Sequence, residues 1–189
     1  GLYQHFRAIA SATRLPCILY NVPSRTVTNL PAEVVLRLSE VDNILGVKEA
    51  SANLEQVARI IQGVKRKDFL VWSGNDGDTL PILALGGYGV ISVISHLVGK
   101  QIREMIDDFL QGRTAEAAAI HRRLLPLVSA MFLVANPIPL KYALNRVGFR
   151  VGRPRLPLVE PDEKTAAQID STLKNCTIDL APYHSPEGK

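Results

Sequence analysis

The stretch ILGVKE at residues 44–49 is an apolar run that ends abruptly in a charged pair, Lys48-Glu49. An apolar run this short, with almost no alternation of polar residues, is typical of a parallel strand that is covered on both faces. Three similar runs surround it, at residues 15–21, 69–73 and 89–93. The sequence therefore predicts four parallel strands, each followed by polar residues.

Helical patterns fill the spaces between these runs. Asn53 can cap a helix in which apolar residues recur at helical spacing up to residue 64, and Pro31 suits the first turn of another helix. Further helices are expected at residues 1–12 and 77–86. This alternation is that of βα units with right-handed crossovers, as in a barrel or a doubly wound sheet.

Beyond Ser95 the pattern is helical only. We expect four helices there: one around residues 102–110, one capped by Thr114 and bent at Pro126, one at residues 138–147 and one capped by Asp162. The predicted organisation is thus a βα part at residues 1–95, a helical extension at 96–174 and a frayed tail at 175–189.

Composition excludes several classes of protein. Of the 189 residues, 47% are hydrophobic and 21% charged, which is typical of a globular protein and not of a disordered one. A net charge of +4 does not by itself predict nucleic-acid binding. The longest apolar run, residues 124–135, is too short to span a bilayer. Cys17 and Cys176 lack the spacing of a zinc site or a disulfide framework, which fits a reducing cytoplasm.

The N-terminus has neither an initiator methionine nor a signal-peptide pattern. We therefore expect the chain to begin inside a longer sequence or to have been processed.

Polar residues at the carboxyl ends of the strands are candidates for catalysis, because α/β sheets and barrels place their active sites there. Lys48 at an apolar mouth would be partly desolvated, which favours the neutral amine that attacks a ketone to form an imine. Tyr20 can move the protons that imine formation requires, and Arg25 can hold a carboxylate through two contacts. Each residue taken alone also fits a solvated lysine, a packing tyrosine or an exposed arginine.

Five segments in order resemble the dihydrodipicolinate synthase family, and the likeness covers nearly the whole chain up to about Asp179. The segments are YNVPSRT at residues 20–26, GVKEAS at 46–51, SGND at 73–76, GGYGVISV at 86–93 and NPIPLK at 136–141. The family fold is a (β/α)8 TIM barrel with a C-terminal helical extension. The resemblance implies an α/β chain that carries the C-terminal half-barrel, with four parallel strands, plus that extension.

The resemblance also implies an activity, the condensation of pyruvate with L-aspartate semialdehyde on the route to diaminopimelate and lysine. Lys48 would form the imine with pyruvate, Tyr20 would relay protons and Arg25 would bind the semialdehyde carboxylate. Gly74 and Ile91 would line the pyruvate end through backbone groups. No metal and no cofactor beyond the covalent imine is expected. The family is cytoplasmic and usually homotetrameric, so the expected partners are the two substrates and further copies, without nucleic acid or membrane.

Two family features are missing. The Gly-Thr-Thr-Gly-Glu stretch, whose threonines bind the pyruvate carboxylate, does not occur, and neither does a Tyr-Tyr-Asn segment that completes the proton relay. The sequence therefore predicts a truncated synthase that is nearly inactive alone. Two alternatives stay open. One is a sister aldolase such as N-acetylneuraminate lyase or 2-keto-3-deoxy-gluconate aldolase, which usually lacks the arginine. The other is a non-catalytic half-barrel.

The remaining charged residues have ordinary structural interpretations. The four histidines share no spacing and are expected to be structural or surface residues: His5, His96, His121 and His184. A basic run is expected to form a solvated or subunit-facing surface: Lys141, Arg146, Arg150, Arg153 and Arg155.

Overall fold

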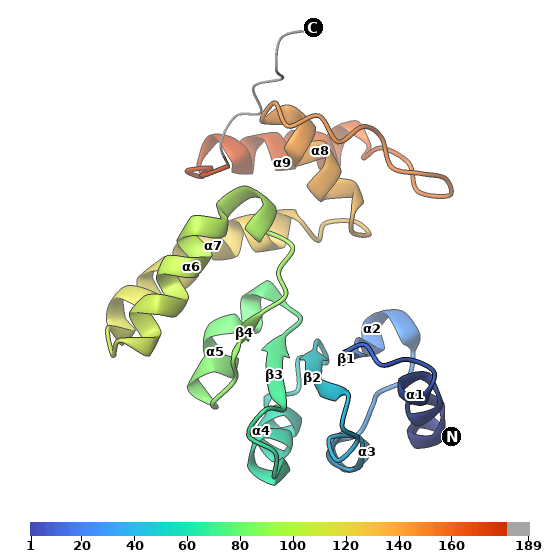
Figure 1. Ribbon diagram of the computed structural model, residues 1–189. Helices are drawn as coiled ribbons and strands as arrows, with labels where there is room; N and C mark the ends of the chain where they lie inside the picture. Colours follow the sequence, from blue (N-terminus) through green and yellow to red (C-terminus); the bar gives the residue numbers. More distant parts are fainter. Residues whose placement is uncertain (181–189) are drawn as a thin grey trace, which may run out of the picture. The chain divides into compact units, whose positions relative to one another are not determined.

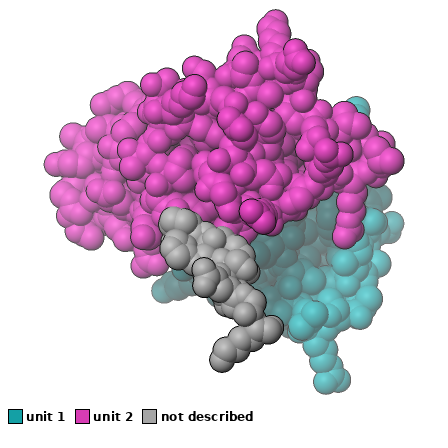
Figure 2. Space-filling view, turned by 90° about the horizontal axis from the view of Figure 1, so that it is seen from above, with its two compact units in different colours: residues 1–92 teal, residues 93–189 magenta. Residues whose placement is uncertain are grey.

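The structure is a computed structural model that describes residues 1–180. The chain divides into two compact units, Gly1–Ser92 and one that begins at Val93 (Figure 2). Each unit has its own set of secondary-structure elements, and the two are described separately.

The first unit alternates strands and helices (Figure 1). In chain order its elements are α1 (Leu2–Ser11), β1 (Cys17–Asn21), α2 (Pro23–Thr26), α3 (Ala32–Leu38), β2 (Ile44–Glu49), α4 (Leu54–Gly63), β3 (Leu70–Ser73), the 3-10 turn η1 (Asp76–Asp78), α5 (Thr79–Ala84) and β4 (Gly89–Val90). Within residues 1–180 the strands form one sheet of order β1-β2-β3-β4, and every neighbouring pair is parallel. The prediction of four parallel strands joined by helices is confirmed.

The fourth strand is shorter than its apolar run predicts. β4 ends at Val90, which pairs with Ser73, the last residue of β3. One more ladder bond follows, from the Ile91 amide to the Ser73 carbonyl at 2.9 Å. Beyond this point the chain of β3 leads into η1 and no longer runs alongside β4 as a strand, so β4 ends early.

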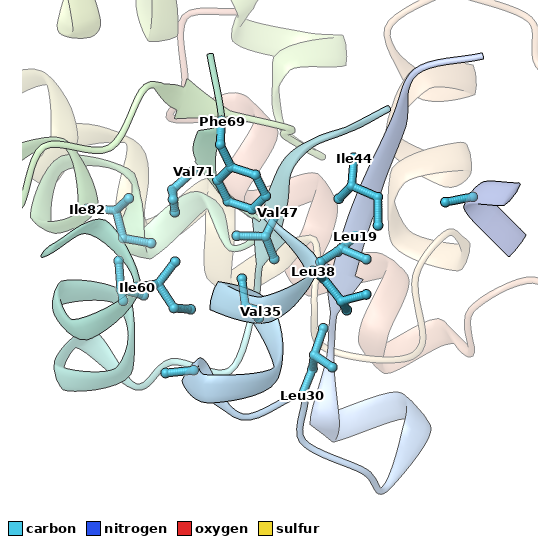
Figure 3. Close-up of a cluster of buried hydrophobic side chains, with 13 residues drawn as sticks. Leu19, Leu30, Val35, Leu38, Ile44, Val47, Ile60, Phe69, Val71 and Ile82 are labelled. Carbon is cyan, nitrogen blue, oxygen red and sulfur yellow. The ribbon is translucent and has the colours of Figure 1, made fainter. Parts of the chain in front are cut away.

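One face of the sheet carries the core of this unit (Figure 3). Leu19, Val47 and Val71 project from three adjacent strands towards the helices, and each is at most 5% exposed. They pack in one cluster with buried side chains of α3, α4 and α5: Val35, Leu38, Ile60 and Ile82. Strand alternation sends the intervening residues to the opposite face.

The opposite face of the sheet is only partly covered. Ile18 is 48% exposed and Tyr20 is 44% exposed, although both lie on a strand whose other face is in the core. The apolar runs predict strands covered on both faces, and for residues 1–180 this is wrong. Four strands form an open sheet, whereas a closed barrel would place these side chains inside.

The second unit is helical. Its helices are α6 (Ser95–Leu110), α7 (Thr114–Ala130), α8 (Ile138–Arg146) and α9 (Glu163–Lys174). Asp162 caps α9 as predicted, because its Oδ1 accepts a hydrogen bond from the Thr165 amide at 2.7 Å. The predicted cap of α7 is wrong by one residue: Arg113 occupies the N-cap position without a side-chain bond, and Thr114 is the first helical residue.

The sequence predicts a frayed tail from residue 175, but in the structure the tail is hydrogen-bonded as far as Asp179. The Asp179 amide donates to the Leu97 carbonyl at 3.0 Å, and its Oδ2 accepts from the Gln101 amide at 3.0 Å. The Gln101 side chain also donates to the Thr177 carbonyl at 2.7 Å. These bonds attach the segment to α6, and residues 181–189 of the predicted tail lie outside the described residues. No helix in residues 1–180 has the length and apolar content needed to cross a membrane.

Candidate active site

Tyr20 and Lys48 face each other at the carboxyl ends of β1 and β2. The parallel ladder pairs the two residues directly, so their side chains leave the sheet on the same side. The Lys48 Nζ atom lies 4.2 Å from the centroid of the Tyr20 ring. An amine at this distance over a phenol ring is attracted to it when charged. The structure thus brings together the two residues that the sequence analysis proposes for imine chemistry.

Trp72 extends this row across the next strand. It pairs with Lys48 in the β2–β3 ladder, and its ring meets Tyr88 edge-on, with the centroids 5.7 Å apart. Gly46 makes the room for it: a Cβ atom there would come within 2.4 Å of the Trp72 ring and 2.2 Å of the Leu70 carbonyl. The sequence analysis missed Trp72. Its position in the apolar run at residues 69–73 is a signal that could have identified it, because pairing of the strands places its side chain on the same face of the sheet as Lys48.

Arg25 lies apart from the pair. It belongs to α2, a single turn that starts directly after β1, and its side chain is exposed. Within the described residues it forms no ion pair, so it is placed near the carboxyl end of β1 without being fixed against Tyr20 or Lys48. The sequence analysis did not predict α2, since a turn of four residues leaves no periodic pattern.

Gly74 and Ile91 continue the ladder beyond the last strand residues. The Gly74 amide donates to the Glu49 carbonyl at 2.7 Å, just as the Ile91 amide donates to Ser73. A ligand at these two residues would therefore meet their carbonyl oxygens. A Cβ atom at Gly74 would lie 2.7 Å from the Ala50 Cβ and 3.1 Å from the Glu49 carbonyl, so the close approach of β2 and β3 requires glycine here.

The loop after β3 is held by its own polar side chains. The Ser73 hydroxyl donates to the Asn75 carbonyl at 2.6 Å, and Asn75 Nδ2 donates to Asp78 at 2.8 Å. Ser92 donates to the buried carboxylate of Asp76, which joins this loop to the end of β4. Among residues 1–180 no group of three or more His, Cys, Asp or Glu side chains is arranged to hold a metal ion.

Behind the Tyr20–Lys48 pair lies a polar cluster made by the buried residues Asn21, Glu49 and Gln56 together with the exposed Asn29. Asn21 and Glu49 are each 1% exposed and Gln56 is 3% exposed. Asn21 and Glu49 pair in the ladder one residue after Tyr20 and Lys48, and therefore project to the helix side of the sheet. The sequence analysis noted both as polar residues at strand ends but assigned them no role.

The sequence model of the dihydrodipicolinate synthetase family matches residues 1–176. A curated relative, the 4-hydroxy-tetrahydrodipicolinate synthase of a Dehalococcoides mccartyi strain, is 64% identical over 180 residues, which are 95% of this chain and 60% of the relative. The synthase of Moorella thermoacetica is 51% identical over 176 residues, which are 91% of this chain and 60% of the relative. The chain thus spans about 60% of the length of these curated relatives.

Solved structures give the same result. The dihydrodipicolinate synthase of Cyanidioschyzon merolae with lysine bound matches with a TM-score of 0.90 at 46% identity, covering 93% of this chain and 59% of that one. The enzyme of Thermotoga maritima matches with a TM-score of 0.88 at 42% identity, covering 92% of this chain and 60% of that one. The predicted fold is confirmed as a partial TIM barrel of four parallel strands with added helices. The chain belongs to the dihydrodipicolinate synthetase family.

Proposed function

We propose that this chain carries the imine-forming part of a 4-hydroxy-tetrahydrodipicolinate synthase, which condenses pyruvate with L-aspartate semialdehyde. The observation that carries the proposal is the contact of Lys48 with Tyr20, with Nζ 4.2 Å from the ring centroid, at the carboxyl ends of adjacent barrel strands. Active sites of TIM barrels lie at this end. The relatives' names give the product, 4-hydroxy-tetrahydrodipicolinate, and the two substrates are those that the family resemblance implies.

The first step joins pyruvate to the chain. The neutral Lys48 amine attacks the keto carbon, and the carbinolamine then loses its oxygen as water to leave an imine. The Tyr20 ring lies under the amine, and its hydroxyl is proposed to pass protons from the nitrogen to the departing oxygen.

The imine then acts as the electron acceptor. Loss of a methyl proton gives an enamine, whose carbon attacks the semialdehyde aldehyde and forms the new carbon–carbon bond. The C=O π bond of the aldehyde breaks, and its oxygen takes up a proton in place of the one lost to become the hydroxyl group. The amino group of the second substrate displaces Lys48 from the imine carbon, which closes the ring and frees the lysine. One water leaves in total, and neither a metal nor another cofactor is required by this sequence of steps.

Arg25 is proposed to bind the carboxylate of the second substrate. Its exposed side chain follows β1 directly, so it can reach a substrate held on Lys48 from the carboxyl end of the sheet. Gly74 and Ile91 are proposed to contact pyruvate through their carbonyl groups. The free thiols of Cys17 and Cys176 suit a reducing cytoplasm, and family resemblance favours a homotetramer there.

Substrate comparison tests the proposal. The part of the Dehalococcoides relative that this chain does not cover is joined before Gly1, where the family resemblance implies that the other barrel strands belong. We expect the joined protein, called the extended form below, to condense pyruvate with the semialdehyde and to leave N-acetylneuraminate and 2-keto-3-deoxy-gluconate uncleaved. Lys48→Arg, which keeps the charge but not the nucleophile, should abolish turnover. Preferential cleavage of a sugar acid would show a sister aldolase, and turnover by Lys48→Arg would refute the imine.

A further inference from the structure

The polar cluster behind the site is built around a buried carboxylate. Glu49 is 1% exposed, and within residues 1–180 its hydrogen-bond donors are all neutral. Oε1 accepts from the Ser51 amide at 2.8 Å and from Asn21 Nδ2 at 3.0 Å, while Oε2 accepts from Gln56 Nε2 at 3.0 Å and from Asn21 Nδ2 at 3.1 Å. A buried carboxylate is tolerated only when such donors replace water, so the geometry of this cluster is tightly specified.

A second layer of bonds fixes the donors themselves. Asn21 Oδ1 accepts from the Leu30 amide at 2.9 Å, and Asn21 Nδ2 also reaches Asn29 Oδ1 at 2.9 Å. Asn29 Nδ2 in turn donates to Gln56 Oε1 at 2.9 Å. Through Glu49 the cluster therefore joins β1, β2, α4 and the segment before α3.

The cluster lies where the relative position of Tyr20 and Lys48 is set. Each residue of the pair is the backbone neighbour of a cluster member, Asn21 or Glu49, and the Ala50 amide donates to the Asn21 carbonyl at 2.8 Å in the same place. A shift of one strand against the other at this end would displace the phenol from the amine. Misplacement of reacting groups by about 1 Å can lower a rate about a hundredfold.

We propose that Glu49 is a positioning residue for imine formation: it fixes the carboxyl ends of β1 and β2 so that the Tyr20 phenol stays over the Lys48 amine. This role rests on the proposed function. It assigns to Glu49 no contact with substrate.

The test uses the extended form and measures how fast borohydride traps pyruvate on Lys48. Glu49→Gln turns one acceptor oxygen into a donor that faces the Asn21 amide. We expect the trapping rate at saturating pyruvate to fall about tenfold to a hundredfold, with the half-saturating pyruvate concentration unchanged. The double variant Asn21→Asp with Glu49→Gln exchanges donor and acceptor, and the Leu30 amide can still donate to residue 21. Turning over the Asn29 and Gln56 amides then gives each of their contacts in the cluster a donor and an acceptor again. It should restore the rate to within about threefold of the unsubstituted protein.

Asn43→Ala is the matched control. The Asn43 side chain donates to the Ala10 carbonyl at 2.9 Å and to the Thr13 carbonyl at 3.2 Å, and so joins α1 to the amino end of β2. This variant should lower the unfolding temperature but leave the trapping rate of the folded protein unchanged.

Gln56→Met is the milder variant if Glu49→Gln does not fold. It removes one donor to Glu49 and should slow trapping a few-fold in a folded protein. Trapping at the unsubstituted rate in either folded variant, or a double variant no better than Glu49→Gln alone, would overturn the positioning role. If the unsubstituted protein forms no adduct on Lys48, the proposed function fails and the role of Glu49 fails with it.

Discussion

Two side chains on neighbouring strands, Tyr20 and Lys48, face each other because the ladder of β1 and β2 pairs their backbones. The lysine is half-buried, its amine lies over the Tyr20 ring of one neighbouring strand, and its backbone pairs with Trp72 of the other. The chemistry of the site is therefore set by strand register before any loop contributes.

Arg25 offers a prediction at the same scale. In the extended form, Arg25→Ala should raise the KM for the semialdehyde about tenfold to a hundredfold, since a charge-assisted hydrogen bond contributes about 1.5–3 kcal/mol. Pyruvate trapping on Lys48 should be unaffected. Steady-state kinetics with each substrate varied in turn gives both values.

Arg37→Ala is the control for the loss of one exposed positive charge. Arg37 lies on α3, where its guanidinium is 4.1 Å from the centroid of the Tyr3 ring, and it should not change either KM. If Arg25→Ala instead loses pyruvate trapping and keeps its semialdehyde KM, the assigned role is wrong.

At the scale of elements, the strands could be predicted because each is a short apolar run with polar residues after it. The residue at which β4 ends could not be predicted, because it depends on where β3 leads into η1 and not on residues 91–93 themselves. The cap at Asp162 was predictable from a local pattern, whereas α2 and the position of Trp72 against Gly46 depend on contacts between strands.

The candidate site shows the same division. Tyr20 and Lys48 could be proposed from their motifs, and their contact follows from register. The Glu49 cluster could not be predicted, because its members lie up to 35 residues apart and meet only when α4 packs on the sheet.

The two helix caps with bonded side chains give a prediction with a pH dependence. The Thr165 hydrogen bonds hold the pKa of Asp162 below its usual range. A depressed pKa means that the capping charge stabilises α9 above the ordinary aspartate pKa and that this contribution disappears as the pH falls through the lower value. Asp162→Ala should therefore lower the unfolding temperature by a few degrees at pH 7, and by less in strong acid.

Asn53→Ala is the matched control for this measurement. Asn53 caps α4 with a neutral side chain that accepts from the Gln56 amide at 2.9 Å. Its loss should lower the unfolding temperature by a similar amount at both pH values. If Asp162→Ala lowers the unfolding temperature as much in strong acid as at pH 7, the charge-based account of the α9 cap is contradicted.

At the scale of the whole molecule, the open sheet is the dominant feature. Three large side chains on the face that carries Lys48 are exposed: Ile18 is 48%, Tyr20 44% and Tyr88 61% exposed. Within the described sheet, β1 also has a neighbouring strand on one side only. An unpaired strand edge and an exposed apolar face both favour association with another chain.

The 189-residue chain alone is therefore expected to self-associate and to have almost no synthase activity. Adding the uncovered N-terminal part of the relative as a separate chain should raise activity and reduce self-association. Light scattering and the condensation assay, run on the same samples, follow both effects. Full turnover by the isolated chain as a monomer would contradict this account of how the site is completed.

The central claim is that Lys48 forms the imine, and one measurement addresses it directly. The extended form is treated with pyruvate and borohydride, digested, and mapped by mass spectrometry. We predict a reduced pyruvyl adduct on Lys48, with the other lysines unmodified and no adduct when pyruvate is omitted. An adduct on another lysine, with Lys48 unmodified, would contradict the claim.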